Sequence, residues 1–120
     1  MTNGIGAKEA MEGTADPKKV TVCITPGATL SDPPTVNPDP VRLYRKNSSE
    51  NPKKIKWECA DRSAKFKVEF GPGTPFDHPD YDEKRPESSE PRDNSAGNTY
   101  KYSVSVNGGT ALDPQVIIQP

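Results

Sequence analysis

The chain has 120 residues, of which 30% are hydrophobic and 28% charged, with 14 prolines and 9 glycines. A chain of this length forms one domain at most, and so low a hydrophobic fraction leaves much of it outside any core. The formal net charge of −1 gives no overall attraction to nucleic acid or membranes, and no run approaches the roughly 18 apolar residues of a membrane-spanning helix. We therefore expect no nucleic-acid or membrane partner, and take a monomer as the working expectation.

The N-terminal segment, residues 1–17, is polar and shows no sustained hydrophobic period, so we expect it to be disordered. It has neither the basic stretch nor the apolar run of a signal peptide. The compartment is therefore unknown from the sequence as given, with the cytoplasm as the default. The single folded domain is expected over residues 18–120.

Alternating hydrophobic residues predict short strands along this domain. The first covers residues 18–24 and is stopped by Pro26 and Gly27. Four prolines between residues 29 and 40 allow only an edge strand around Val36. Further strands are expected over residues 41–44, 53–59, 65–70, 100–106 and 115–118. No apolar stripe with a helical period is present, so the class is all-β.

Two of these strands place Trp57 and Phe66 on their inward faces. The pair fits a hairpin, in which Trp57 faces Phe66, and equally an arch that crosses from one sheet of a sandwich to the other. Periodicity does not separate the two arrangements. About 20 apolar side chains over all strands suffice for a thin core, each worth roughly 1.5–3 kcal/mol when buried, with Trp57 at its centre.

Residues 71–97 form the longest stretch without a strand pattern. They include five prolines, seven acidic and three basic side chains, and few hydrophobic residues. No core strand is expected there, and a loop of this length is usually either functional or disordered. We expect a long, flexible polar loop before the last two strands.

The order of these strands resembles that of the cupredoxins. Residues 55–58 are similar to the cupredoxin strand that ends in Trp, 66–70 to the strand that begins with a His ligand, and 100–104 to the aromatic strand that leads to the Cys ligand. Residues 115–118 stand at the closing strand. The resemblance covers about residues 18–118 and implies an antiparallel Greek-key β-sandwich.

The resemblance also identifies the positions at which cupredoxins bind copper. Phe66 stands at the first His, Val104 at the Cys, Asn107 at the second His and Leu112 at the Met. None of these side chains binds copper as a blue-copper site does, because thiolate and imidazole are both absent. The resemblance therefore implies the fold, while copper and electron transfer are not expected, and no other cofactor is.

A candidate site surrounds His78, which lies in an acidic stretch with Asp77, Asp80 and Asp82. Carboxylates beside an imidazole raise its pKa and orient it, as in metal or general-base sites. The same residues fit a solvated loop, and their spacing lacks that of an EF-hand calcium loop. A metal site built from these four residues is kept as the alternative hypothesis. No nucleophile stands in a recognisable motif, so an enzyme is not expected.

Cys23 and Cys59 allow one disulfide or none. Alternation points Cys23 outward and Cys59 inward, whereas a disulfide requires Cβ atoms about 3.8 Å apart. Unless a strand end turns one of them, we expect free thiols, with Cys59 as a small buried hydrophobic side chain.

Charge is distributed unevenly along the chain. Residues 42–67 carry nine basic and three acidic side chains, net +6, whereas residues 71–97 are net −4. One interpretation is that the basic stretch binds an anionic partner, in which case the acidic loop either covers this face or imitates the partner. Alternatively, it is a solvated sheet face whose lysines prevent edge-to-edge aggregation.

The function that these observations favour is a non-catalytic, metal-free binding or interaction module. Its partner, a protein or a small molecule, is unknown. Loops at one end of the sandwich would make the contact, with Phe76, His78 and Tyr81 as the partner-binding residues. Under this hypothesis, replacing Phe76 or Tyr81 by Ala leaves the thermal transition unchanged.

Overall fold

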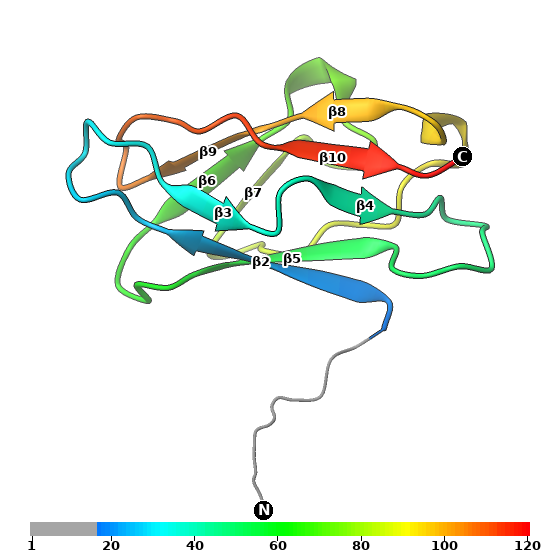
Figure 1. Ribbon diagram of the computed structural model, residues 1–120, viewed down its shortest axis with the longest axis horizontal. Helices are drawn as coiled ribbons and strands as arrows, with labels where there is room; N and C mark the ends of the chain where they lie inside the picture. The colour runs from blue at the N-terminus through cyan, green and yellow to red at the C-terminus, as the bar shows by residue number, and fades with distance from the viewer. Residues whose placement is uncertain (1–16) are drawn as a thin grey trace, which may run out of the picture.

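The chain forms three small sheets of three strands each (Figure 1). The computed structural model describes residues 17–120, so the predicted disordered segment 1–17 lies outside the described residues except for Pro17. No α-helix occurs within the described part. The strands are β2 (Lys19–Thr25), β3 (Thr35–Asn37), β4 (Val41–Leu43), β5 (Lys54–Cys59), β6 (Phe66–Glu69), β7 (Asp80–Asp82), β8 (Thr99–Lys101), β9 (Ser103–Val106) and β10 (Gln115–Ile118). The prediction of a β-rich protein is confirmed.

The sheets have the strand orders β3-β2-β5, β4-β10-β8 and β7-β6-β9. Four strand pairs are antiparallel, but β2 pairs with β5 in parallel, and so does β4 with β10. The expectation of a wholly antiparallel arrangement is therefore wrong at these two pairs. Alternation fixes which face of a strand is buried, but it carries no information on the direction of the neighbouring strand.

The second and third sheets are joined along one extended run of chain, residues 99–106. The strand expected there is interrupted at Tyr102, whose backbone N–H donates to the carbonyl of Pro114 (3.0 Å). Val104 and Leu112 then exchange two backbone hydrogen bonds of 2.9 Å, so the residues before β10 pair with β9. The two sheets therefore continue into each other.

Residues 60–65 form an arch. β5 belongs to the first sheet and β6 to the third, and no β5–β6 pairing occurs, so Trp57 and Phe66 are not cross-strand partners. Of the two arrangements that the sequence allowed, the structure has the arch.

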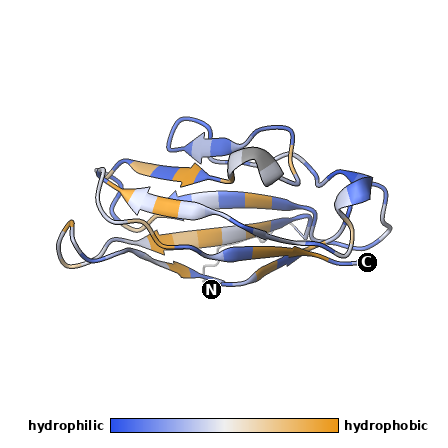
Figure 2. Ribbon diagram, turned by 90° about the horizontal axis from the view of Figure 1, so that it is seen from above, coloured by the Kyte–Doolittle hydropathy of each residue, from blue (hydrophilic) through white to orange (hydrophobic). Residues whose placement is uncertain are grey.

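A single hydrophobic core draws on all three sheets. Trp57 is 1% exposed, as expected for the residue at the centre of the core. Hydrophobic and hydrophilic residues alternate along the strands in Figure 2, which is the pattern of sheets with one buried face. The buried hydrophobic residues are Val22, Ile24, Val41, Leu43, Ile55, Trp57, Ala64, Phe66, Val68, Phe70, Phe76, Tyr81, Tyr102, Val104, Val106, Val116 and Ile118.

The long segment 71–97 is packed against this core. It contains β7, which pairs with β6, and two 3₁₀ turns at Gly71–Gly73 and Asp93–Ser95. The expectation that it holds no core strand is therefore wrong, and its packing gives no support to a flexible loop. The strand was missed because β7 is only three residues long and buries one hydrophobic side chain, Tyr81.

The same segment covers the free edge of β5. The backbone N–H of Trp57 donates to the carbonyl of Pro86 (2.9 Å), and that of Ser88 donates to the carbonyl of Ile55 (2.9 Å). The buried hydroxyl of Ser88 accepts the N–H of Ile55 (3.0 Å). Residues 86–88 therefore occupy backbone groups that would otherwise be open to edge-to-edge pairing.

Candidate functional site

Phe76 and Tyr81 lie in the core rather than on the surface. They are 0% and 2% exposed. Tyr81 stacks on Trp57 with ring centroids 4.9 Å apart, and Phe76 contacts Phe70 edge to face at 5.4 Å. Both side chains therefore pack in the core, and this burial argues against the expectation that their removal leaves the thermal transition unchanged. The sequence missed this because each is flanked by polar residues in a stretch without alternation.

Burial also changes the acidity of two tyrosines in this aromatic cluster. Loss of hydration raises the pKa of Tyr102 to about 12, although its hydroxyl accepts a hydrogen bond from the Trp57 indole N–H (3.4 Å). Burial likewise raises the pKa of Tyr81 to about 12, and its hydroxyl donates to the carbonyl of His78 (3.1 Å). Both phenols are therefore protonated at neutral pH.

His78, the third residue predicted to bind a partner, is exposed. Its carbonyl accepts hydrogen bonds from the hydroxyls of Thr74 and Tyr81. The backbone at His78 is therefore fixed while the imidazole faces solvent.

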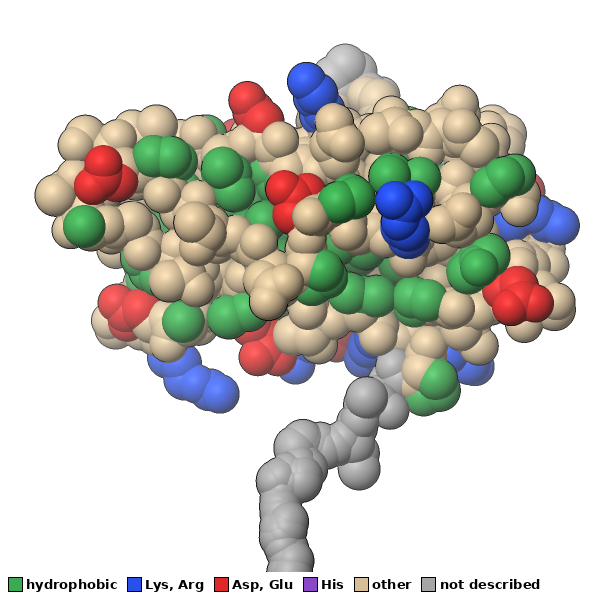
Figure 3. All heavy atoms as spheres, in the orientation of Figure 1, with side chains coloured by type: hydrophobic (Ala, Val, Ile, Leu, Met, Phe, Trp, Pro, Cys, Tyr) green, Lys and Arg blue, Asp and Glu red, His purple; other side chains and the backbone are tan. Residues whose placement is uncertain are grey.

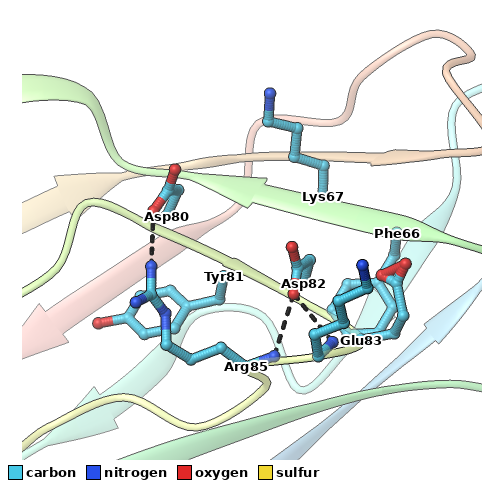
Figure 4. Close-up of a pocket in the computed structure, with 8 residues that line it drawn as sticks. Phe66, Lys67, Asp80, Tyr81, Asp82, Glu83 and Arg85 are labelled. Atoms are coloured by element: carbon cyan, nitrogen blue, oxygen red, sulfur yellow. Dashed lines mark hydrogen bonds and ion pairs between the residues drawn. The ribbon is translucent and has the colours of Figure 1, made fainter.

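The acidic residues around His78 have local partners of their own. One Asp82 oxygen accepts the backbone N–H groups of Lys84 (2.8 Å) and Arg85 (3.0 Å), and the Arg85 guanidinium lies 3.2 Å from Asp80 (Figure 4). Among residues 17–120, no three side chains of His, Cys, Asp or Glu come together as a metal site would require. The alternative metal hypothesis therefore has no geometric support in the described residues.

A polar cleft lies between β6 and the turn that follows β7 (Figure 4). Its volume is about 480 Å³, and Phe66, Lys67 and residues 80–85 line it. Three cationic and three carboxylate side chains face this cleft, and the Asp80–Arg85 pair joins one of each. Such a balanced, internally paired lining gives no preference for one sign of ligand charge.

Of the four positions that the resemblance compares with copper ligands, Phe66 and Asn107 lie at one end of the β6–β9 pair, and Val104 and Leu112 lie further along it. Phe66 pairs with Val106, and Val104 pairs with Leu112. The side chain of Asn107 accepts the backbone N–H of Lys65 (2.9 Å) beside Phe66. Phe66 and Val104 are buried at 5% and 0% exposure, so hydrocarbon fills their positions.

Leu30, for which the sequence predicts no role, lies at the same end of the molecule. Leu30 is the one large hydrophobic side chain exposed among residues 17–120, at 62%. Its carbonyl accepts the N–H of Thr110 (2.9 Å), and a Cβ built on Gly109 would lie 2.7 Å from that carbonyl oxygen. One sequence signal for this exposure exists: Leu30 is a single large hydrophobic residue among the turn-forming residues Gly, Thr, Ser, Asp and Pro. No strand is expected there that would direct its side chain into the core.

A depression of about 300 Å³ lies between this loop and the β9–β10 turn. Asp32 and Asp61 are its charged lining residues, and the other lining residues are Pro26, Gly27, Ala28, Thr29, Leu30, Pro34, Val106, Asn107 and Thr110.

Both cysteines are free, as predicted, with Cys23 exposed and Cys59 partly buried. In the parallel β2–β5 pair Cys23 lies beside Glu58 and Cys59 beside Ile24, so the two cysteines are offset by one residue. Burial raises the pKa of the Cys59 thiol, and this effect outweighs the lowering by a hydrogen bond from the Asp61 backbone. Cys59 is thereby a less reactive thiol.

Ion pairs attach the acidic segment to two parts of the chain. Arg45 of the basic stretch pairs with Asp93 (3.0 Å), and Lys19 of β2, outside that stretch, pairs with Glu87 (2.9 Å). The N–H of Asn47 also donates to Asp93, and together with Arg45 it lowers the pKa of that carboxyl. Part of the acidic segment is therefore fastened to the basic one.

Comparisons of the chain with known protein families, with curated proteins and with solved structures found no match. Among residues 17–120, no helix has the length and apolar character needed to cross a membrane.

Proposed function

We propose that this chain is a metal-free, non-catalytic binding module with a cupredoxin-like Greek-key arrangement, and that it contacts its partner through loops at one end of the sandwich. The exposed Leu30, whose backbone is held by the bond from Thr110, is the observation that carries this proposal. A loop whose backbone is already fixed loses little conformational freedom on binding, which favours affinity.

The arch between β5 and β6 supports the cupredoxin-like part of the proposal. The resemblance compares β5 and β6 with two cupredoxin strands, and in this chain the arch carries the backbone from the Trp57 strand in one sheet to β6 in another. The β6–β9 pairing brings Phe66 and Val104 into one ladder, two residue pairs apart, although they are 38 residues apart in the chain. The side chains at the four positions compared with copper ligands are Phe, Val, Asn and Leu, which supports a module without copper.

The packing of residues 71–97 supports a preformed surface. This segment fills the core with Phe76 and Tyr81 and closes the β5 edge with residues 86–88. Because Phe76 and Tyr81 are buried, Leu30 is the one large hydrophobic side chain that the described residues expose to a partner.

Photo-cross-linking tests the proposal. Benzoylphenylalanine placed at position 30 is expected to give a discrete adduct with one cellular component. The control position, Glu50, is exposed and lies in the β4–β5 connection at the opposite end of the molecule (Figure 1). Absence of an adduct at position 30, or equal adducts at both positions, would contradict the proposal.

A further inference from the structure

The loop that carries Leu30 is braced from both sides. Within the loop, the N–H of Asp32 donates to the carbonyl of Thr29 (3.1 Å), and a Cβ on Gly27 would lie 2.4 Å from the carbonyl oxygen of Asp32. Across the depression, Thr110 donates to Leu30. The backbone is therefore fixed at the residue whose side chain projects into solvent.

The two carboxylates of the depression are also held in place. Asp61 accepts the backbone N–H (2.9 Å) and the hydroxyl (2.6 Å) of Ser63, and Asp32 accepts the hydroxyl of Thr29 (3.2 Å). These hydrogen bonds from Ser63 lower the pKa of Asp61. Neither carboxylate has an ion-pair partner within residues 17–120.

No Lys or Arg side chain lines the depression. Its surface consists of hydrocarbon, neutral turn groups and two fixed negative charges. Figure 3 shows hydrophobic and acidic side chains interspersed over the corresponding end of the molecule, on the left of the view, with a basic side chain at its lower edge. A neutral apolar ligand would leave both charges without a partner, and an anionic ligand would be repelled by them.

From this charge pattern we infer that the depression is a docking site for a basic, apolar segment of a protein partner, in which Lys or Arg side chains alternate with Leu-like residues. The apolar residue packs against Leu30, and the cation lies over Asp32 and Asp61. The inference rests on the proposed function, since it specifies the chemistry of the partner of the same loop end.

A peptide titration tests this inference on the full chain. The probe is acetyl-Leu-Arg-Leu-Arg-amide, followed through backbone amide chemical shifts. Saturable shifts are expected at Leu30, Asp61 and Thr110, weakened by added salt because the contact includes ion pairs. Two matched peptides serve as controls: one has Glu in place of Arg, the other Ser in place of Leu. Both are expected to bind at least about tenfold more weakly.

Variants separate the two parts of the contact. Leu30→Ser removes the apolar group while keeping the backbone bond to Thr110, and Asp61→Asn removes a charge while keeping an oxygen that accepts from Ser63. Each is expected to weaken the probe peptide about tenfold. Glu50→Gln, which changes the net charge equally at the other end of the molecule, is expected to leave its affinity unchanged.

Three results would overturn the inference: no shifts at Leu30, Asp61 and Thr110 at millimolar peptide, equal binding of the Ser-containing peptide, or the same shifts with spermidine alone. The last would identify a small polyamine site rather than a peptide site. These failures are distinct from failure of the proposed function, because an adduct formed at position 30 would still demonstrate a partner of different chemistry.

Discussion

Tyr81 stacks on Trp57, with ring centroids 4.9 Å apart and an interplanar angle of 27°. This contact joins β7, the three-residue strand of the long polar segment, to β5, the strand that carries Trp57. Phe76, five residues earlier, fills the same cluster at 0% exposure. The segment therefore belongs to the core even though its composition is that of a loop.

Removing Phe76 is therefore expected to destabilise the protein. Phe76→Ala leaves a cavity among Phe70 and Tyr81 and should lower the free energy of unfolding by about 3–5 kcal/mol. Urea unfolding followed by Trp57 fluorescence measures this. His78→Ala, at an exposed position two residues away, is the control and should stay within about 0.5 kcal/mol of the parent. Equal stability of the two variants would place Phe76 outside the core.

The bonding of Ser88 leads to a second prediction. Ser88→Ala leaves the buried N–H of Ile55 without its side-chain acceptor, at a cost of about 1–3 kcal/mol. Faster hydrogen exchange at Ile55 and Trp57 should accompany this loss, because residues 86–88 hold the β5 edge. Ser49→Ala, at an exposed position, is the control. Unchanged exchange at both amides would show that the Ser88 hydroxyl does not secure the edge.

The alternation of hydrophobic and polar residues predicted most of the strands and their buried faces. Val22, Trp57 and Val68 each stand in a run in which every second side chain is hydrophobic, so their burial was predicted. The pairing of the strands was not predicted. β2 and β5 are parallel neighbours in one sheet, although β3 and β4 lie between them in the sequence.

The candidate site was less predictable than the fold. The chain neighbours of Phe76 and Tyr81 predict surface positions for both, yet contacts with Phe70 and Trp57 bury them. The sequence makes no prediction for Leu30, and its backbone is held by the close approach of Gly109, 79 positions later. Neither contact leaves a local pattern in the sequence.

The pKa values of the buried tyrosines predict a loss of stability at alkaline pH. Tyr81 and Tyr102 have folded pKa values of about 12, above the value near 10 of an unfolded chain. Their contribution is fully present below pH 10 and is lost as the pH rises toward 12, because the unfolded chain then releases the protons more readily. Tyr102→Phe should reduce this alkaline loss, as measured by unfolding between pH 9 and 12. An unchanged slope would contradict burial of the phenol.

The close approach of Gly109 to Leu30 predicts strain on adding a methyl group. Gly109→Ala would place its Cβ 2.7 Å from the Leu30 carbonyl oxygen and displace the bond from Thr110, at a cost of about 1–3 kcal/mol. Amide exchange at Thr110 should accelerate. Gly73→Ala is the matched control, since no atom lies within 4 Å of its added Cβ. Equal behaviour of the two variants would mean that the loop is not braced at this point.

The cupredoxin-like arrangement can be tested by restoring the missing ligands. The variant carrying Phe66→His, Val104→Cys, Asn107→His and Leu112→Met brings two imidazoles, a thiolate and a thioether onto the β6–β9 pair and the segment that follows it. Copper(II) is expected to give this variant the intense visible absorption of a copper–thiolate bond. The control keeps Val104 and changes the other three positions, so it lacks the thiolate and should stay colourless. If the folded quadruple variant binds no copper, the four positions do not have the cupredoxin geometry, and the resemblance is limited to strand order.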